Sequence, residues 1–127
     1  MKKTFLLTSL FAVLAPIKPI ILTLSFVIIC DFIFGIYRAY KCGESITSRK
    51  MSQTLPKLFL YNCIIIVLFC VDKYVINTGI GLEKVGATFM IMVELKSCDE
   101  SFNTIFGYSL WNKLIDTIER GKSITKK

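Results

Sequence analysis

The chain has 127 residues, enough for one small domain, and 54% of them are hydrophobic, with a mean hydropathy of +0.60. This apolar content exceeds that of an ordinary soluble domain and indicates a membrane protein. Histidine is absent, which argues against the common zinc sites. The formal net charge is +7. Such a basic surplus suits either nucleic acid or anionic lipid, and the long apolar segments favour lipid.

The N-terminal stretch, residues 1–18, has two lysines before an apolar run and so imitates a secretory signal. Cleavage after Ala15 is disfavoured because Pro16 would follow the cut, so we expect the segment to be retained. Residues 5–14 predict an apolar helix of roughly 15 Å, and Pro16 and Pro19 separate it from the next segment. An interfacial helix is favoured over an unusually short fourth span.

We predict the first membrane span over residues 19–39. As a helix, residues 19–37 reach roughly 28 Å, close to a hydrocarbon core of about 30 Å. Twelve Leu, Ile, Phe or Val residues in this stretch contribute roughly −4 to −7 kcal/mol to insertion, whereas Asp31 costs about +3 kcal/mol at most. The span therefore tolerates the carboxylate, and Tyr37 and Tyr40 suit an interfacial aromatic belt.

The connection that follows, residues 40–54, is predicted to be a basic loop. With its flanks it sets five basic residues against Glu44 alone, and these are Arg38, Lys41, Arg49, Lys50 and Lys57. The next connection balances two acids with two lysines, namely Asp72, Glu83, Lys73 and Lys84. The positive-inside rule places the first connection in the cytoplasm of a bacterium and the second outside. Three spans then leave the N-terminus outside, and a short fourth span would bring it inside.

The second span is predicted over residues 55–76 and the third over residues 77–95. The second encloses the polar Asn62 and reaches Asp72 and Lys73 near the outer boundary, where a lysine can snorkel. The third is weaker because it contains Glu83, Lys84 and Glu94. Its glycines permit close approach of a neighbouring helix, and these are Gly79, Gly81 and Gly86. We expect it to insert beside the other two spans.

The C-terminal region, residues 96–121, predicts an amphipathic cytoplasmic helix that Gly121 should end, followed by a basic tail over residues 122–127. Its apolar side comprises Leu110, Trp111, Leu114, Ile115 and Ile118. Trp111 on such a face suits the bilayer interface. Packing against the cytoplasmic ends of the bundle or of a neighbouring subunit explains the pattern equally well.

Acids and small residues share one side of the first span. Asp31, Gly35 and Ala39 follow one another at four-residue spacing, and the last two form a small-xxx-small pair that lets another helix come close. Acids inside a membrane are functional candidates, although Asp31 at this position can also serve a local contact or snorkel to the boundary. We hypothesise that Asp31, Asn62, Glu94 and the three glycines lie in subunit contacts or line a pore.

The order of three motifs resembles a known family. DFIFGIYRAYKCGESITSRK, then LPKL opening an apolar span, then VELKSCDESFNTIFGYSLWNKL is similar to the phage holins also called toxin-secretion/phage-lysis holins. The family pattern has D-x-x-x-G-x-x-x-A near a span end, then a serine (here Ser45 or Ser48) before basic residues. A tail motif closes the last span, here Glu94, Ser97, Glu100 and Gly107. Ser101 departs from it, since the family usually has asparagine there.

The resemblance, over about residues 20–114, implies a multi-pass protein of the bacterial inner membrane. Holins accumulate there late in infection, associate with copies of themselves at a set time and form lesions through which an endolysin reaches the cell wall; some relatives release toxins instead. The implied partners are other copies of the chain, the lipid bilayer, an endolysin and in some cases an antiholin. No catalysis, cofactor or metal is implied.

Other classes of function fit the sequence less well. A non-lytic structural or assembly subunit of a membrane complex and a small ion channel remain alternatives. A transporter is disfavoured because no inverted repeat is visible. No G-x-S-x-G or phosphate loop suggests an enzyme, and the basic residues form no surface for nucleic acid. The five cysteines contain no C-x-x-C pair, and those in apolar runs are expected to pack as small hydrophobes.

Overall fold

The computed structural model describes residues 1–45 and 48–125, with the side chains of residues 1–45 and 52–124. The elements are α1 (Lys2–Leu14), the 3-10 turn η1 (Ala15–Ile17), α2 (Lys18–Lys41), α3 (Ser48–Val71), the π-helical turn η2 (Asp72–Ile76), α4 (Leu82–Phe106) and α5 (Leu110–Thr125). All secondary structure in the described residues is helical, which confirms the predicted all-α class.

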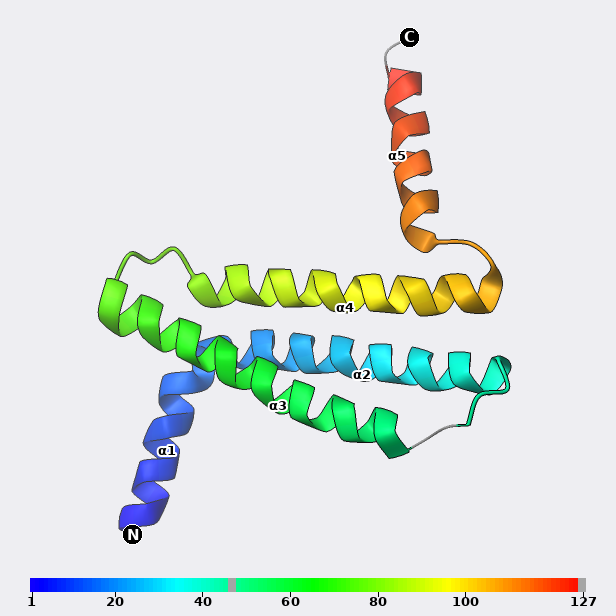
Figure 1. Cartoon of the computed structure of the whole chain (residues 1–127). Coiled ribbons are helices and arrows are strands. Elements are labelled where there is room, and N and C mark those ends of the chain that lie inside the picture. The colour runs from blue at the N-terminus through cyan, green and yellow to red at the C-terminus, as the bar shows by residue number, and fades with distance from the viewer. Residues whose placement is uncertain (46–47, 126–127) are drawn as a thin grey trace.

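A bundle of α2, α3 and α4 forms the body of the molecule. Figure 1 shows α2 and α4 side by side and running in the same direction, with α3 running back across them. The short helices α1 and α5 leave the bundle at opposite ends and point to opposite sides (Figure 1). The bundle therefore has one end at the α3–α4 turn, beside α1, and another at the α2–α3 connection, beside α5.

The apolar core lies in the half of the bundle near the α3–α4 turn. Leu24 and Ile28 of α2, Ile65 of α3 and Ala87 of α4 are buried together. Gly86 lies against the Leu68 side chain, so closely that a Cβ there would collide with it. The sequence thus predicted correctly that Gly86 permits close helix approach.

Most of the apolar surface of α2 and α3 faces outward. Two helical stretches, Lys2–Lys41 and Ser52–Ile76, are long and apolar enough to cross a membrane, and only 11% of the most apolar part of each is buried. Phe26 is 66% exposed and Phe59 is 70% exposed. Such a surface suits lipid and is unlike the core helix of a soluble protein.

The third predicted span is not among these two stretches. Within the described residues, α4 fails the same test of length and composition because charged residues interrupt its apolar sequence. Its beginning also differs from the prediction, since α4 starts at Leu82. The preceding residues form the turn after η2, so Gly79 and Gly81 do not share a helix face with Gly86.

The boundaries at the ends of α3 and α4 correct two further predictions. Residues 48–54, assigned to the basic loop, already belong to α3; residues 46–47 and the side chains of residues 46–51 lie outside the described part. Residues 96–106, assigned to the amphipathic helix, continue α4 until Gly107 ends it at φ 78°. Glycine at such a position is a common helix terminator because it adopts positive φ without strain.

The amphipathic helix itself is α5, Leu110–Thr125. It continues through Gly121, so the expectation that this glycine ends the helix was wrong. Apolar side chains of its predicted apolar side, including Trp111 and Ile118, are exposed. The helix touches the bundle mainly through α4, and residues 126–127 of the predicted tail lie outside the described part.

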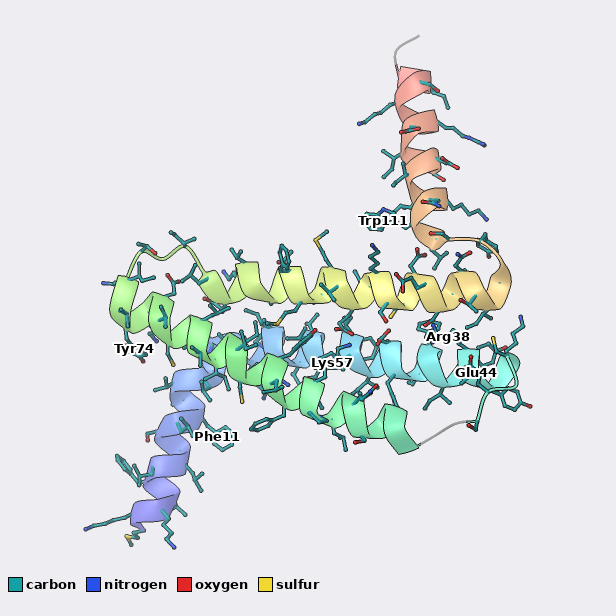
Figure 2. The ribbon with its side chains drawn as sticks, viewed as in Figure 1. Phe11, Arg38, Glu44, Lys57, Tyr74 and Trp111 are labelled. Carbon is teal, nitrogen blue, oxygen red and sulfur yellow. The ribbon has the colours of Figure 1, made fainter. Side chains whose placement is uncertain are left out.

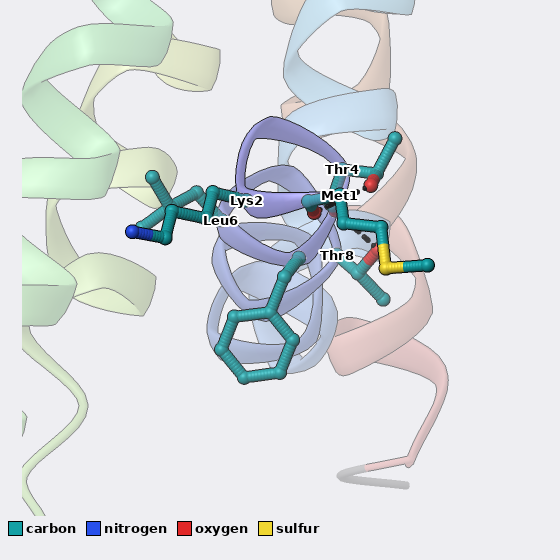
Figure 3. A pocket seen from close by; sticks show the side chains of 6 residues that line it. Met1, Lys2, Thr4, Leu6 and Thr8 are labelled. Atoms are coloured by element: carbon teal, nitrogen blue, oxygen red, sulfur yellow. Dashed lines mark hydrogen bonds between the residues drawn. The ribbon is translucent and has the colours of Figure 1, made fainter.

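The N-terminal helix α1 stands apart from the bundle. Every one of its residues except Leu14 is exposed. Figure 3 shows an open hollow along its first turns, lined by this helix alone. There the hydroxyls of Thr4 and Thr8 donate to the backbone oxygens of Met1 and Thr4, each at 2.8 Å. Hydroxyls satisfied within the helix suit an apolar surrounding that offers no other partner.

Candidate functional site

A cluster of three charged side chains joins the bundle helices in the half near the α2–α3 connection. Lys57 Nζ of α3 lies 2.6 Å from Glu94 Oε2 of α4 and 3.8 Å from Asp31 Oδ2 of α2. Figure 2 shows Lys57 where α3 crosses α2. One ammonium therefore links all three helices.

Burial makes this cluster energetically important. The Glu94 side chain is fully buried, whereas those of Asp31 and Lys57 are 18% and 32% exposed. Desolvating charges is costly unless they are paired, and removing one partner leaves the other charge buried without compensation. One carboxylate oxygen of the cluster is not satisfied, since Glu94 Oε1 has no hydrogen-bond partner among the described residues.

The inward face of α4 explains how the sequence delivers Glu94 to this place. The buried residues of α4 are Glu83, Ala87, Glu94, Ser101 and Ile105. Their spacing of four and seven residues places them on one side of a helix. Two of the four acids of α4, Glu83 and Glu94, thus point into the bundle, which can shield them from lipid.

Asp31 has a second contact within its own chain. The Cys98 thiol of α4 donates to Asp31 Oδ1 at 3.8 Å. Asp31 is thus shielded by α3 and α4 of its own chain, which agrees with the local contact that the sequence left open; its part in subunit contacts stays a prediction. Of the small residues on the same side of α2, Ala39 is fully buried, whereas no atom lies within 4 Å of the position a Gly35 Cβ would take.

Asn62 forms a second polar contact between helices. Its Nδ2 donates to Ser25 Oγ of α2 at 3.1 Å and to the backbone oxygen of Leu58 at 2.9 Å. Its Oδ1 has no partner in the structure. Polar side chains that bond across helices hold bundles together in lipid, where apolar burial provides no net driving force.

The turn between η2 and α4 is organised by Asp72. Its carboxylate accepts from the backbone N–H of Gly81 at 2.9 Å and from Thr78 Oγ1 at 3.1 Å. Asn77 and Gly81 adopt left-handed conformations, with φ 52° and 75°. Asp72, expected to sit at the membrane boundary, is therefore a buried residue that shapes the turn.

At the other end of α4, Asp99 holds α5. Its Oδ2 accepts from Ser109 Oγ at 2.6 Å and its Oδ1 from the Trp111 N–H at 3.2 Å. The interfacial candidate Trp111 is thus attached to α4 through a charged cap.

The comparisons with known proteins can now be set beside this geometry. The model of the bacteriophage holin family matches residues 8–122. The chain belongs to the bacteriophage holin family. Searches among curated proteins and among solved structures give no match. Holins are membrane proteins of phage that act in cell lysis and are not a family of enzymes, as the sequence resemblance implied.

The tail motif of this holin takes up different structural positions. Glu94 joins the ion cluster, Ser97 is half-buried, Glu100 is exposed and Gly107 ends α4. These four residues thus lie along one continuous helix and its terminus. Of these four, only Glu94 was predicted to lie in subunit contacts or a pore, and that remains a prediction.

Sequence analysis missed the residue at the centre of the cluster. Lys57 was counted among the charges of the cytoplasmic loop, and Ser25 and Cys98 were not considered as polar partners. A signal was present, because Lys57 lies inside the second membrane-candidate stretch, Ser52–Ile76, and a lysine there calls for a carboxylate partner. Which carboxylate it meets depends on how α3 crosses α2 and α4.

Proposed function

We propose that this protein is a holin whose copies associate in the bacterial cytoplasmic membrane and form lesions that let an endolysin reach the cell wall. The family match over residues 8–122 and the two long apolar helical stretches support it. Expected partners are further copies of the chain and the lytic enzyme.

We propose that α4 crosses the membrane together with α2 and α3. It has 25 residues and α2 has 24, so both are about 36 Å long, enough for a hydrocarbon core of about 30 Å. The two lie side by side (Figure 1), and Glu83 and Glu94 face inward. Insertion beside α2 and α3 removes these acids from lipid, which explains how so polar a helix can span.

The charge distribution supports an orientation with the α2–α3 connection in the cytoplasm. Arg38 and Lys41 lie near the C-terminal end of α2, beside that connection, and basic residues near span ends favour the cytoplasmic side. Then α5 would lie along the inner interface and α1 along the outer one, at opposite ends of the bundle (Figure 1). In this arrangement α1 is an interfacial helix and not a short fourth span.

The outward face of α4 is the single observation that best supports the formation of lesions. Thr88, Lys96 and Asn103 are exposed there among apolar Phe89 and Met92, and at about 100° per residue this mixed face is on the side opposite to Glu94. A lysine near a bilayer centre costs about 3 kcal/mol on insertion. In an assembly of copies this face would border water, which removes that cost.

Expression of the chain in a bacterium without other phage genes tests the proposal. We expect an abrupt collapse of membrane potential followed by release of a large cytoplasmic reporter protein. The Lys96→Leu variant should delay the collapse at equal membrane abundance, because its outward face is better suited to lipid. Lys122→Leu, an exposed lysine of α5, is the matched control and should follow the parent.

The outcomes separate the competing functions. A chain that leaves the potential intact acts as a structural subunit, and the proposal then fails. Leakage of ions without release of the reporter indicates a small channel, and contradicts a lesion large enough for an enzyme. Equal timing in the parent and the Lys96→Leu variant contradicts the role of the outward face.

A further inference from the structure

A polar crevice opens between α2, α3 and α4 in the half of the bundle near the α2–α3 connection. Its volume is about 260 Å³. Each helix contributes polar side chains to its walls, including Arg38 from α2, Gln53 from α3, and Ser97 and Ser101 from α4. A space with such walls is ready for a polar occupant and unsuited to acyl chains.

The crevice has two levels along the bundle axis. The deep level is formed by Asp31 and Lys57, both in the ion cluster. The shallow level is formed by Arg38, Gln53 and Ser101. Arg38 follows Asp31 by seven residues, so the two levels are about 10 Å apart along α2.

The shallow level carries a positive charge without a partner. Among the residues that the structure describes, none forms an ion pair or side-chain hydrogen bond with the half-buried Arg38 guanidinium. By contrast, Lys41, one turn further on, donates to the Ile105 backbone oxygen at 2.5 Å and lies 5.3 Å from the Phe106 ring centroid. A half-buried guanidinium without an acceptor in the described part of the chain is available to an acceptor from outside it.

We propose that the shallow level of the crevice binds a phosphate group, that of an anionic phospholipid in the inner leaflet. The guanidinium fork of Arg38 matches phosphate oxygens in a bidentate manner. The Gln53 amide and the Ser101 hydroxyl add donors from the facing helices. Gly35 leaves room, since no atom lies within 4 Å of the position its Cβ would take.

The surroundings favour a lipid over free phosphate. Phe32 lines the same crevice. Leu55 follows the lining residue Thr54 on α3 and is 65% exposed. In the proposed orientation the mouth lies at the inner boundary of the membrane, where acyl chains can run along these apolar side chains while the headgroup enters. The binding holds whether or not the chain forms lesions.

The deep level confines the phosphate to the shallow one. Asp31 and Glu94 place two carboxylates beside one ammonium, so the deep level carries a surplus negative charge. This surplus lies about 10 Å from Arg38 along α2. It disfavours a phosphate beside the cluster, so the guanidinium at the mouth is the place where a phosphate binds.

Native mass spectrometry of the full chain in detergent, titrated with phosphatidylglycerol, tests this site. The parent should retain one phosphatidylglycerol per chain, and Arg38→Gln should weaken that retention by roughly tenfold or more, as expected for a lost charge-assisted pair. Arg38→Lys keeps the charge without the fork and should lie between them. Arg120→Gln, which removes an exposed arginine of α5, should match the parent.

A second variant and a competitor complete the test. Ser101→Ala removes one donor from the shallow level and should weaken retention about threefold, which keeps the proposal testable if Arg38→Gln does not fold. Displacement of the lipid by millimolar inorganic phosphate assigns the site to free phosphate, and its persistence assigns it to the headgroup; both support a phosphate site. Equal retention by the parent and Arg38→Gln, or equal loss in Arg38→Gln and Arg120→Gln, overturns it.

Discussion

The half of the bundle near the α3–α4 turn packs apolar side chains, whereas the half near the α2–α3 connection is built around charges. In the first half, Leu24, Ile65 and Ala87 are buried together. In the second, Lys57 bridges Asp31 and Glu94. Apolar burial between helices gains little in lipid, so close packing must stabilise the first half and polar contacts the second. The apolar half spreads its stability over many contacts, while the polar half depends on one lysine.

The largest effect should come from removing that lysine. Lys57→Met keeps the length of the side chain and leaves Asp31 and Glu94 without their cation. We expect it to lower the free energy of unfolding by about 3–5 kcal/mol, the usual cost of breaking a buried pair. Unfolding of the purified chain by sodium dodecyl sulfate in mixed micelles measures the loss.

Two further variants test whether the loss of stability in Lys57→Met comes from the loss of its charge. Lys73→Met removes an exposed lysine near the other end of α3 and should change stability by less than about 0.5 kcal/mol. Combining Lys57→Met with Glu94→Gln should restore part of the lost stability, because the buried charge goes as well. A Lys57→Met chain as stable as the parent contradicts a polar half that depends on the cluster.

The apolar half should be more tolerant, and Gly86 tests its packing. A Cβ at Gly86 would collide with the end of the Leu68 side chain, so in Gly86→Ala overpacking should offset the helix-propensity gain of about 1 kcal/mol that alanine brings. Gly35→Ala is the matched control, since no atom lies within 4 Å of its Cβ position. It should stabilise α2 slightly through helix propensity. Equal effects of the two alanines, in the same unfolding assay, would remove the distinction between the halves.

The smallest effect concerns the attachment of α5 beyond the polar half. Asp99 accepts hydrogen bonds from Ser109 Oγ at 2.6 Å and from the Trp111 N–H at 3.2 Å, so Asp99→Ala should loosen the α4–α5 junction. Trp111 fluorescence should report a more mobile α5 in this variant. Asp116→Ala, a change in an exposed residue of α5, should leave the fluorescence as in the parent, and an equal change in both variants would contradict a junction held by Asp99.

Sequence reasoning succeeded where the signal is local. Apolar length predicted the helices now seen as α2 and α3, the prolines predicted the break at η1, and the side-chain pattern predicted an amphipathic C-terminal helix. The predicted ends of the helices were less accurate, because the length of an apolar stretch matches the thickness of the membrane and a helix can continue beyond it. α4 continues beyond its apolar part until Gly107, whose N–H bonds the Asn103 oxygen at 2.8 Å, and glycine there was a better signal than hydropathy.

The candidate site was predictable only in part. Asp31, Asn62, Gly86 and Glu94 were singled out as polar or small residues expected to meet other helices, and each has such a neighbour within the chain; their part in subunit contacts or a pore stays a prediction. Their partners were not predictable, since Lys57 lies 37 residues from Glu94 along the chain. Gly79 and Gly81 share a motif of small residues with Gly86 but belong to a turn, where positive φ explains them.

The sequence alone determined that this chain is helical, belongs in a membrane and has the motif order of a holin, because length, hydropathy and local spacing are properties of consecutive residues. Only the tertiary structure decided that Lys57 pairs with acids of two other helices and that Arg38 has no such partner among the described residues. The reason is that the pairing of charges depends on the angle and register at which helices cross, which no single helix encodes.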